Sequence, residues 1–145
     1  MTALGLHARP PNAVVLPRDE MAFRARYRAL LLNRELTTVF RPGDRIYPNW
    51  RGYVEGEIVT ARIIRTPGSD EHGVPPLFED DVRIPIRIET ILVTSIDALC
   101  PDAFFGSSPD VRDRDSLAVH LERIYGRPIA AFGNQVTRIA FRYID

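Results

Sequence analysis

The chain has 145 residues, of which 45% are hydrophobic and 26% are charged, and its formal net charge at pH 7 is zero. This length and composition predict a single domain with an apolar core. The neutral balance gives no bulk electrostatic signal for a nucleic-acid partner.

Membrane and secretory segments are not expected in this sequence. No stretch approaches the roughly 20 apolar residues of a membrane-spanning helix, and the start does not resemble a signal peptide. We therefore predict a soluble, cytoplasmic protein with no membrane partner. The single cysteine, Cys100, excludes an internal disulfide and a thiolate cluster and is expected to be a small buried side chain. Neither a metal nor a cofactor is predicted.

Charge is distributed unevenly along the chain. All 19 basic residues are arginine, and residues 18–65 hold ten of them against six acids, about +4. Residues 66–115 hold four arginines against eleven acids, about −7. Arginine suits phosphate and carboxylate and stacks on bases, but it stays protonated and is a poor general base.

The first part of the chain predicts an arm followed by a helix. Residues 1–17 contain three prolines and read as an N-terminal arm with an edge strand at 14–16, and His7 in this arm has no expected metal role. Asp19 is a plausible helix cap. Apolar residues then recur at helical spacing, which predicts an amphipathic helix over 20–32.

A strand and a turn come next. Residues 37–41 predict a strand in which Thr37 and Arg41 share a face, because side chains alternate with period two. Pro42, Gly43 and Asp44 form a turn signal, after which residues 45–47 can resume a strand.

The remaining residues continue mainly as strands. The alternation of residues 82–88 with charged neighbours predicts a half-buried strand that continues to Val93 with a register shift near Thr90. His120 lies beside the apolar stripe of a helix, which indicates a hydrogen-bonded histidine at the edge of the core. The other predicted elements are a strand at 54–65, an acidic surface loop at 66–81, helical turns at 95–99 and 101–105, a helix capped by Asp115 and ending at Gly126, and a closing strand at 135–144.

This order predicts an α+β fold built on a small, mostly antiparallel β-barrel with flanking helices. Residues 18–145 form the predicted domain.

The residues on both sides of the predicted turn at 42–44 are candidates for the lining of a binding cleft. Its arginines can take phosphate or a base edge and its aromatic rings can stack on a base, a combination suited to RNA or single strands. Arg24 and Arg28 are candidates for secondary phosphate contacts. The predicted ligand-binding residues are Thr37, Arg41, Arg45, Tyr47, Trp50, Arg51 and Tyr53.

Four pieces of the sequence resemble the ASCH domains of the PUA-like superfamily, and more narrowly the small bacterial acetylcytidine amidohydrolases. They are FRARYRALLLNRELTTVFRPGDRIY, SIDAL, the RIYG that ends a helix, and the closing VTRIAFRYI. The likeness spans residues 21–144, with residues 66–81 as an insertion. It implies a six-stranded PUA-like barrel with a cleft beside the loop after the first long helix.

The resemblance also implies where a catalytic set would lie. The family loop reads approximately glycine, arginine, lysine, threonine, any residue, threonine, any residue, arginine. The lysine position falls on Leu36, the threonines on Thr37 and Val39, and the final arginine on Arg41. The family's glutamate falls near Ser107, where the candidate acids are Asp102 and Asp110.

Three functions remain open from the sequence. The first is a binding module for RNA, single-stranded nucleic acid or a modified nucleotide. The second is an acetylcytidine-type amidohydrolase or other nucleic-acid enzyme that uses Thr37 with an altered catalytic set. The third is a protein-interaction module that uses the acidic loop and the arm. The sequence leaves the oligomeric state open.

Overall fold

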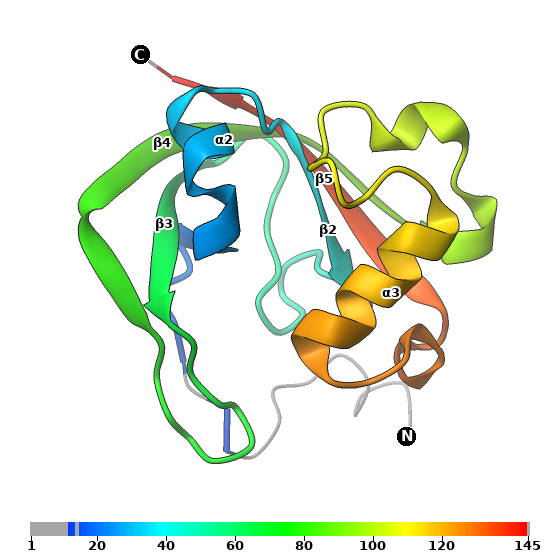
Figure 1. The fold of residues 1–145 in the computed structure, drawn as a ribbon, viewed down its shortest axis with the longest axis horizontal. Coiled ribbons are helices and arrows are strands. Elements are labelled where there is room, and N and C mark those ends of the chain that lie inside the picture. Colours follow the sequence, from blue (N-terminus) through cyan, green and yellow to red (C-terminus); the bar gives the residue numbers. More distant parts are fainter. Residues whose placement is uncertain (1–11, 14, 145) are drawn as a thin grey trace.

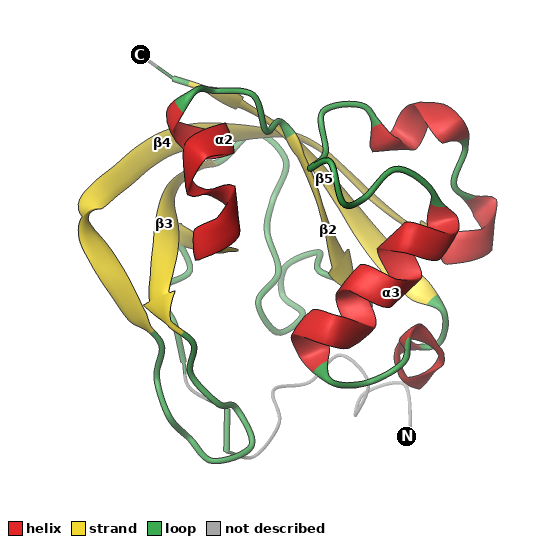
Figure 2. Ribbon diagram, in the orientation of Figure 1, coloured by secondary structure: helices red, strands yellow, loops and turns green. Residues whose placement is uncertain are grey.

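A curled five-stranded sheet forms the frame of the molecule (Figures 1 and 2). The computed structural model describes residues 12–13 and 15–144. The strand order is β1-β3-β4-β5-β2, so the first two strands of the chain are the two edges of a half-barrel. The strands are β1 (Glu20–Arg24), β2 (Thr38–Pro42), β3 (Ile58–Thr66), β4 (Leu77–Ser95) and β5 (Gln135–Tyr143).

The sheet is mixed, which corrects the predicted mostly antiparallel barrel. β1 pairs in parallel with β3, whereas the three other pairings are antiparallel. A parallel partner must come from a distant part of the chain, and local alternation carries no information about it. The α+β class agrees with the prediction.

The predicted helix over 20–32 is wrong in its first half. Met21 and Phe23 are buried at alternate positions of β1, and only Ala25–Tyr27 (η1) and Arg28–Leu32 (α2) are helical. The apolar spacing fits both structures. Pairing with β3 decides in favour of the strand, since tertiary context overrides a weak local preference.

β4 is the longest strand and curls across the molecule (Figure 1). Its register against β5 shifts between Ile88 and Thr90, as the change of pattern predicted. The predicted loop at 66–81 is shorter than expected, because β4 already begins at Leu77. The connection contains a bridge between Ser69 and Val74.

Helix α3 (Arg114–Tyr125) packs against the side of the sheet formed by β2 and β5. Asp113 caps it instead of the predicted Asp115, and Gly126 ends it in a left-handed conformation as expected. Leu117 and Leu121 are buried against Phe40. The remaining short helices are η2 (Ile96–Ala98), η3 (Pro101–Phe104) and η4 (Ile129–Phe132).

Cys100 is exposed, which corrects the predicted burial. None of the helices in residues 12–13 and 15–144 is long and apolar enough to cross a membrane. His7 and Val14, the first residue of the strand expected at 14–16, lie outside the described residues. Val15 and Leu16 belong to no strand.

Candidate functional site

A cavity of about 960 Å³ lies where the half-barrel does not close. Its walls include Ala22 and Arg24 from β1 and Thr38 and Arg41 from β2, which are the two edge strands. α3, the stretch 50–53 and the β3–β4 connection complete the walls. The open seam of the sheet is thus the concave site of the protein.

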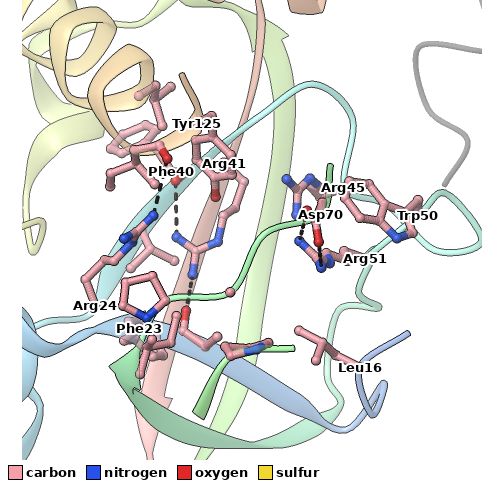
Figure 3. Close-up of a pocket in the computed structure, with 18 of the residues that line it drawn as sticks. Leu16, Phe23, Arg24, Phe40, Arg41, Arg45, Trp50, Arg51, Asp70 and Tyr125 are labelled. Atoms are coloured by element: carbon pink, nitrogen blue, oxygen red, sulfur yellow. Dashed lines mark hydrogen bonds and ion pairs between the residues drawn. The ribbon is translucent and has the colours of Figure 1, made fainter. Parts of the chain in front are cut away.

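Arg41 spans this seam (Figure 3). Its Nη2 donates to the carbonyl oxygen of Ala22 at 2.9 Å, and its Nη1 lies 3.4 Å from the carbonyl oxygen of Phe40. The Arg41 guanidinium carbon also lies 5.6 Å from the centre of the Phe23 ring. Ala22 belongs to β1 and Arg41 to β2, so one side chain links the two edges.

Arg24 reaches the cavity from β1. Its Nη2 donates to the carbonyl oxygen of Ile124 at 3.2 Å. Ile124 lies in the last turn of α3, where backbone carbonyls lack helical partners and attract cations. Backbone carbonyls therefore hold both Arg24 and Arg41.

The turn after β2 places Arg45 in the cavity wall. Gly43 adopts a φ of +78° in the predicted turn. The Thr137 hydroxyl donates to the Gly43 carbonyl at 2.6 Å and accepts from the Arg45 amide at 2.9 Å. Arg45 as a whole residue is only 7% exposed, and its Nε lies 3.3 Å from the Pro42 carbonyl oxygen. Its terminal nitrogens donate no hydrogen bond within the described part of the chain.

Arg24, Arg41 and Arg45 are hereafter the arginine cluster. None of the three forms an ion pair with a carboxylate among residues 12–13 and 15–144. Burial lowers the pKa of Arg45, and the positive charge of Arg41 lowers it further. The cavity thus holds positive charge that has no carboxylate partner among the described residues.

Tyr125, the last residue of α3, lies among these charges (Figure 3). The Arg45 guanidinium carbon is 6.0 Å from the centre of its ring. Burial would raise the pKa of the Tyr125 phenol, but Arg41, Arg45 and two further arginines outweigh it and hold this pKa below its ordinary value. The hydroxyl has no hydrogen-bond partner in the described residues.

A second wall combines an aromatic ring with an ion pair. Arg51 lies over the Trp50 ring, 4.2 Å from its centre, and binds both Asp70 oxygens at 3.0 and 2.9 Å. Asp70 comes from the acidic β3–β4 connection, so this segment neutralises part of the cavity. Tyr53 donates to the Glu20 carbonyl at 3.0 Å, and burial raises its pKa.

A polar group around His120 occupies another part of the wall. The Tyr27 hydroxyl lies 3.0 Å from His120 Nε2 and 3.3 Å from Asp110 Oδ2. Burial lowers the pKa of His120, against the opposing charge of Asp110. Burial would raise the pKa of Asp110, but the hydrogen bond from Ser108 and the charge of His120 hold it below its ordinary value. The predicted hydrogen-bonded histidine is confirmed.

The structure brings most of the predicted site residues together. Thr37 does not line the cavity: its hydroxyl faces Gly106, where an added Cβ would overlap it. Tyr47 is half exposed under the Arg18 guanidinium, and Arg28 pairs with Glu79, so neither is in the wall. The predicted residues that line the cavity are Arg24, Arg41, Arg45, Trp50, Arg51 and Tyr53.

Sequence reasoning missed the wall that α3 contributes. Tyr125 and His120 lie far along the chain from the turn, and only the tertiary fold brings them to it. One signal was present, because Tyr125 directly precedes the glycine that ends the helix. Within residues 12–13 and 15–144 no group of three or more His, Cys, Asp or Glu could hold a metal ion.

No family model, curated protein or solved structure matches the chain. The resemblance to ASCH domains stays a prediction from the sequence.

Proposed function

We propose that the chain is a binding module that takes a nucleotide, or one nucleotide unit of single-stranded RNA or DNA, in the cavity between β1 and β2. The observation that carries this proposal is a cavity whose wall combines an arginine cluster lacking carboxylate partners with the rings of Trp50 and Tyr125. Guanidinium groups suit phosphate oxygens, and aromatic faces stack on bases.

The ASCH assignment belongs to this proposal. A curled half-barrel with a cavity beside its edge strand β2 is compatible with a PUA-like domain. The sequence pieces that resemble ASCH domains supply this cavity with Arg24, Arg41 and Tyr125.

The only tryptophan of the chain provides the test. Trp50 lines the cavity, so a bound ligand should change its fluorescence. We expect saturable changes on titration with ribonucleotides or single-stranded oligonucleotides at low salt, and weaker binding as salt is raised. Absence of binding for all of these at low salt would contradict the proposal.

An enzyme is the second candidate function, and His120 is the observation that favours it. A histidine with a lowered pKa is neutral at pH 7 and can accept a proton, and this one lines the cavity beside Tyr27. The position of Thr37 outside the cavity gives no support to catalysis by its hydroxyl.

Turnover of an acylated cytidine tests this alternative by following release of the carboxylic acid. If the chain is such an enzyme, His120→Gln should abolish turnover and Thr37→Ala should leave most of it. Loss with Thr37→Ala alone would instead favour the catalytic set that the resemblance implies. Ligand binding without turnover leaves the binding module as the function.

A further inference from the structure

The arginine cluster holds more positive charge than a single internal phosphate of a strand can balance. Its three guanidinium groups have no carboxylate partner in the described residues. Of the acids that line the cavity, Asp70 and Glu20 pair with Arg51 and Arg62, and Glu71 is exposed. A phosphodiester carries about one negative charge, whereas a terminal phosphate carries about 1.5 to 2 near pH 7 and offers three acceptor oxygens.

The cluster is also fixed in place before any ligand arrives. Arg24, Arg41 and Arg45 each use one or two nitrogens on a backbone carbonyl, which leaves further N–H donors on every guanidinium. Figure 3 shows Arg24 and Arg41 directed toward the same part of the cavity, near Tyr125. A preorganised cluster binds an anion without the entropic cost of ordering long side chains.

Burial strengthens the argument for Arg45. Arg45 is more than nine-tenths buried, yet its terminal nitrogens donate to none of the described residues. Burying a charge without a partner is costly, and a bound anion removes that cost. Tyr125 adds a hydroxyl that is able to donate to the same anion.

The size of the cavity favours a small ligand. Its volume of about 960 Å³ lies within the roughly 300 to 1,000 Å³ of small-molecule pockets. A mononucleotide fits this range.

We infer that Arg24, Arg41 and Arg45, with the Tyr125 hydroxyl, form a subsite for a terminal phosphate, and that the ligand is a phosphorylated monomer of the nucleoside monophosphate class. This inference rests on the proposed function, because the aromatic wall is assigned to the base. The phosphate lies between the two sheet edges, and the base lies toward Trp50.

The test compares three probes at fixed ionic strength by Trp50 fluorescence and calorimetry: the common ribonucleosides, their 5′-monophosphates, and dinucleoside monophosphates that lack a terminal phosphate. The monophosphate should bind at least about tenfold more tightly than the other two, in line with charge-assisted hydrogen bonds. Inorganic phosphate should compete with it, and acetate should not. Equal affinities for the three probes would overturn the inference.

Variants locate the effect. Arg45→Gln and Arg24→Gln should each weaken binding of the monophosphate about tenfold and that of the nucleoside less than about twofold. Arg28→Gln is the matched control, since Arg28 lies outside the cavity and pairs with Glu79. Thermal unfolding checks that each variant folds. If one of the two cavity variants does not fold, the other still tests the inference.

Different results would contradict the binding module and the terminal-phosphate subsite. If nucleosides and oligonucleotides bind but a terminal phosphate adds nothing, the subsite is wrong and the binding module stands. If no nucleoside, nucleotide or oligonucleotide binds, both are wrong.

Discussion

The arginine cluster differs in its electrostatic surroundings from two arginines elsewhere in the fold, Arg28 on α2 and Arg62 on β3. Arg28 pairs with Glu79, and Arg62 with Glu20, so each positive charge meets a carboxylate. The arginine cluster donates only to backbone carbonyls in the described residues. A chain with zero net charge thus retains unbalanced charge at one place, and composition alone hides this.

The strongest challenge to this contrast is the pair of variants Arg41→Ala and Arg83→Ala. Arg41 lines the cavity and Arg83 is exposed on β4. We expect Arg41→Ala to weaken ligand binding by about a hundredfold, because charge-assisted hydrogen bonds contribute about 1.5 to 3 kcal/mol. Arg83→Ala should change it by less than about twofold. Titration of both against the same ribonucleotide checks this, and equal losses would mean that overall charge, not a formed site, drives binding.

Removing a carboxylate outside the cluster should affect stability. Glu20→Gln leaves Arg62, whose side chain is only 8% exposed, without its partner, and should lower the free energy of unfolding by about 2 kcal/mol. Glu57→Gln is the control, because its partner Arg18 is 42% exposed, and it should cost less than about 1 kcal/mol. Urea denaturation measures both. A cost for Glu20→Gln no larger than that of the control would contradict the contrast.

His120 should make stability depend on pH. Burial lowers its folded pKa below the ordinary 6.5, so the unfolded chain takes up a proton first as the pH falls. Stability is therefore lost as the pH drops from about 6.5 toward the folded pKa. Asp110 contributes to the pH dependence only at lower pH, since its ordinary pKa is 3.8 and its folded pKa is lower still.

His120→Gln should reduce the loss in melting temperature between pH 7.5 and 5.5. An unchanged loss in this variant would show that another group is responsible.

The smallest expected effect concerns Asp70, one of the acids that line the cavity. Asp70→Asn removes one negative charge from the wall, and we expect it to raise affinity for an anionic ligand about threefold at low salt. The gain should shrink as salt increases. Asp80→Asn, a change of an exposed β4 residue that does not line the cavity, is the control. A loss of affinity with Asp70→Asn would show that the Asp70 ion pair is needed to shape the wall.

The sequence predicts elements whose information is local. Strict alternation defines β5, and the change of pattern at Thr90 marks the register shift. The predicted helix over 20–32 is wrong for all of β1, because the apolar residues of β1 also fit a helix and its parallel partner β3 begins at Ile58, far along the chain.

The same limit applies to the site. The turn concentrates Arg41, Arg45 and Trp50 within a short stretch, so the sequence identifies that wall. Tyr125 and His120 reach it only because α3 packs against the sheet. Thr37 departs from its predicted place because Gly106 packs against its hydroxyl, a contact between distant parts of the chain.

The two edges of the half-barrel are consecutive in sequence, although they stand at opposite ends of the sheet. A single stretch, residues 20–53, therefore carries both rims of the opening together with Trp50, while β3, β4 and β5 supply the scaffold. Substitutions within residues 20–53 can therefore change which ligand is bound, while the interior strands β3, β4 and β5 keep their sequence.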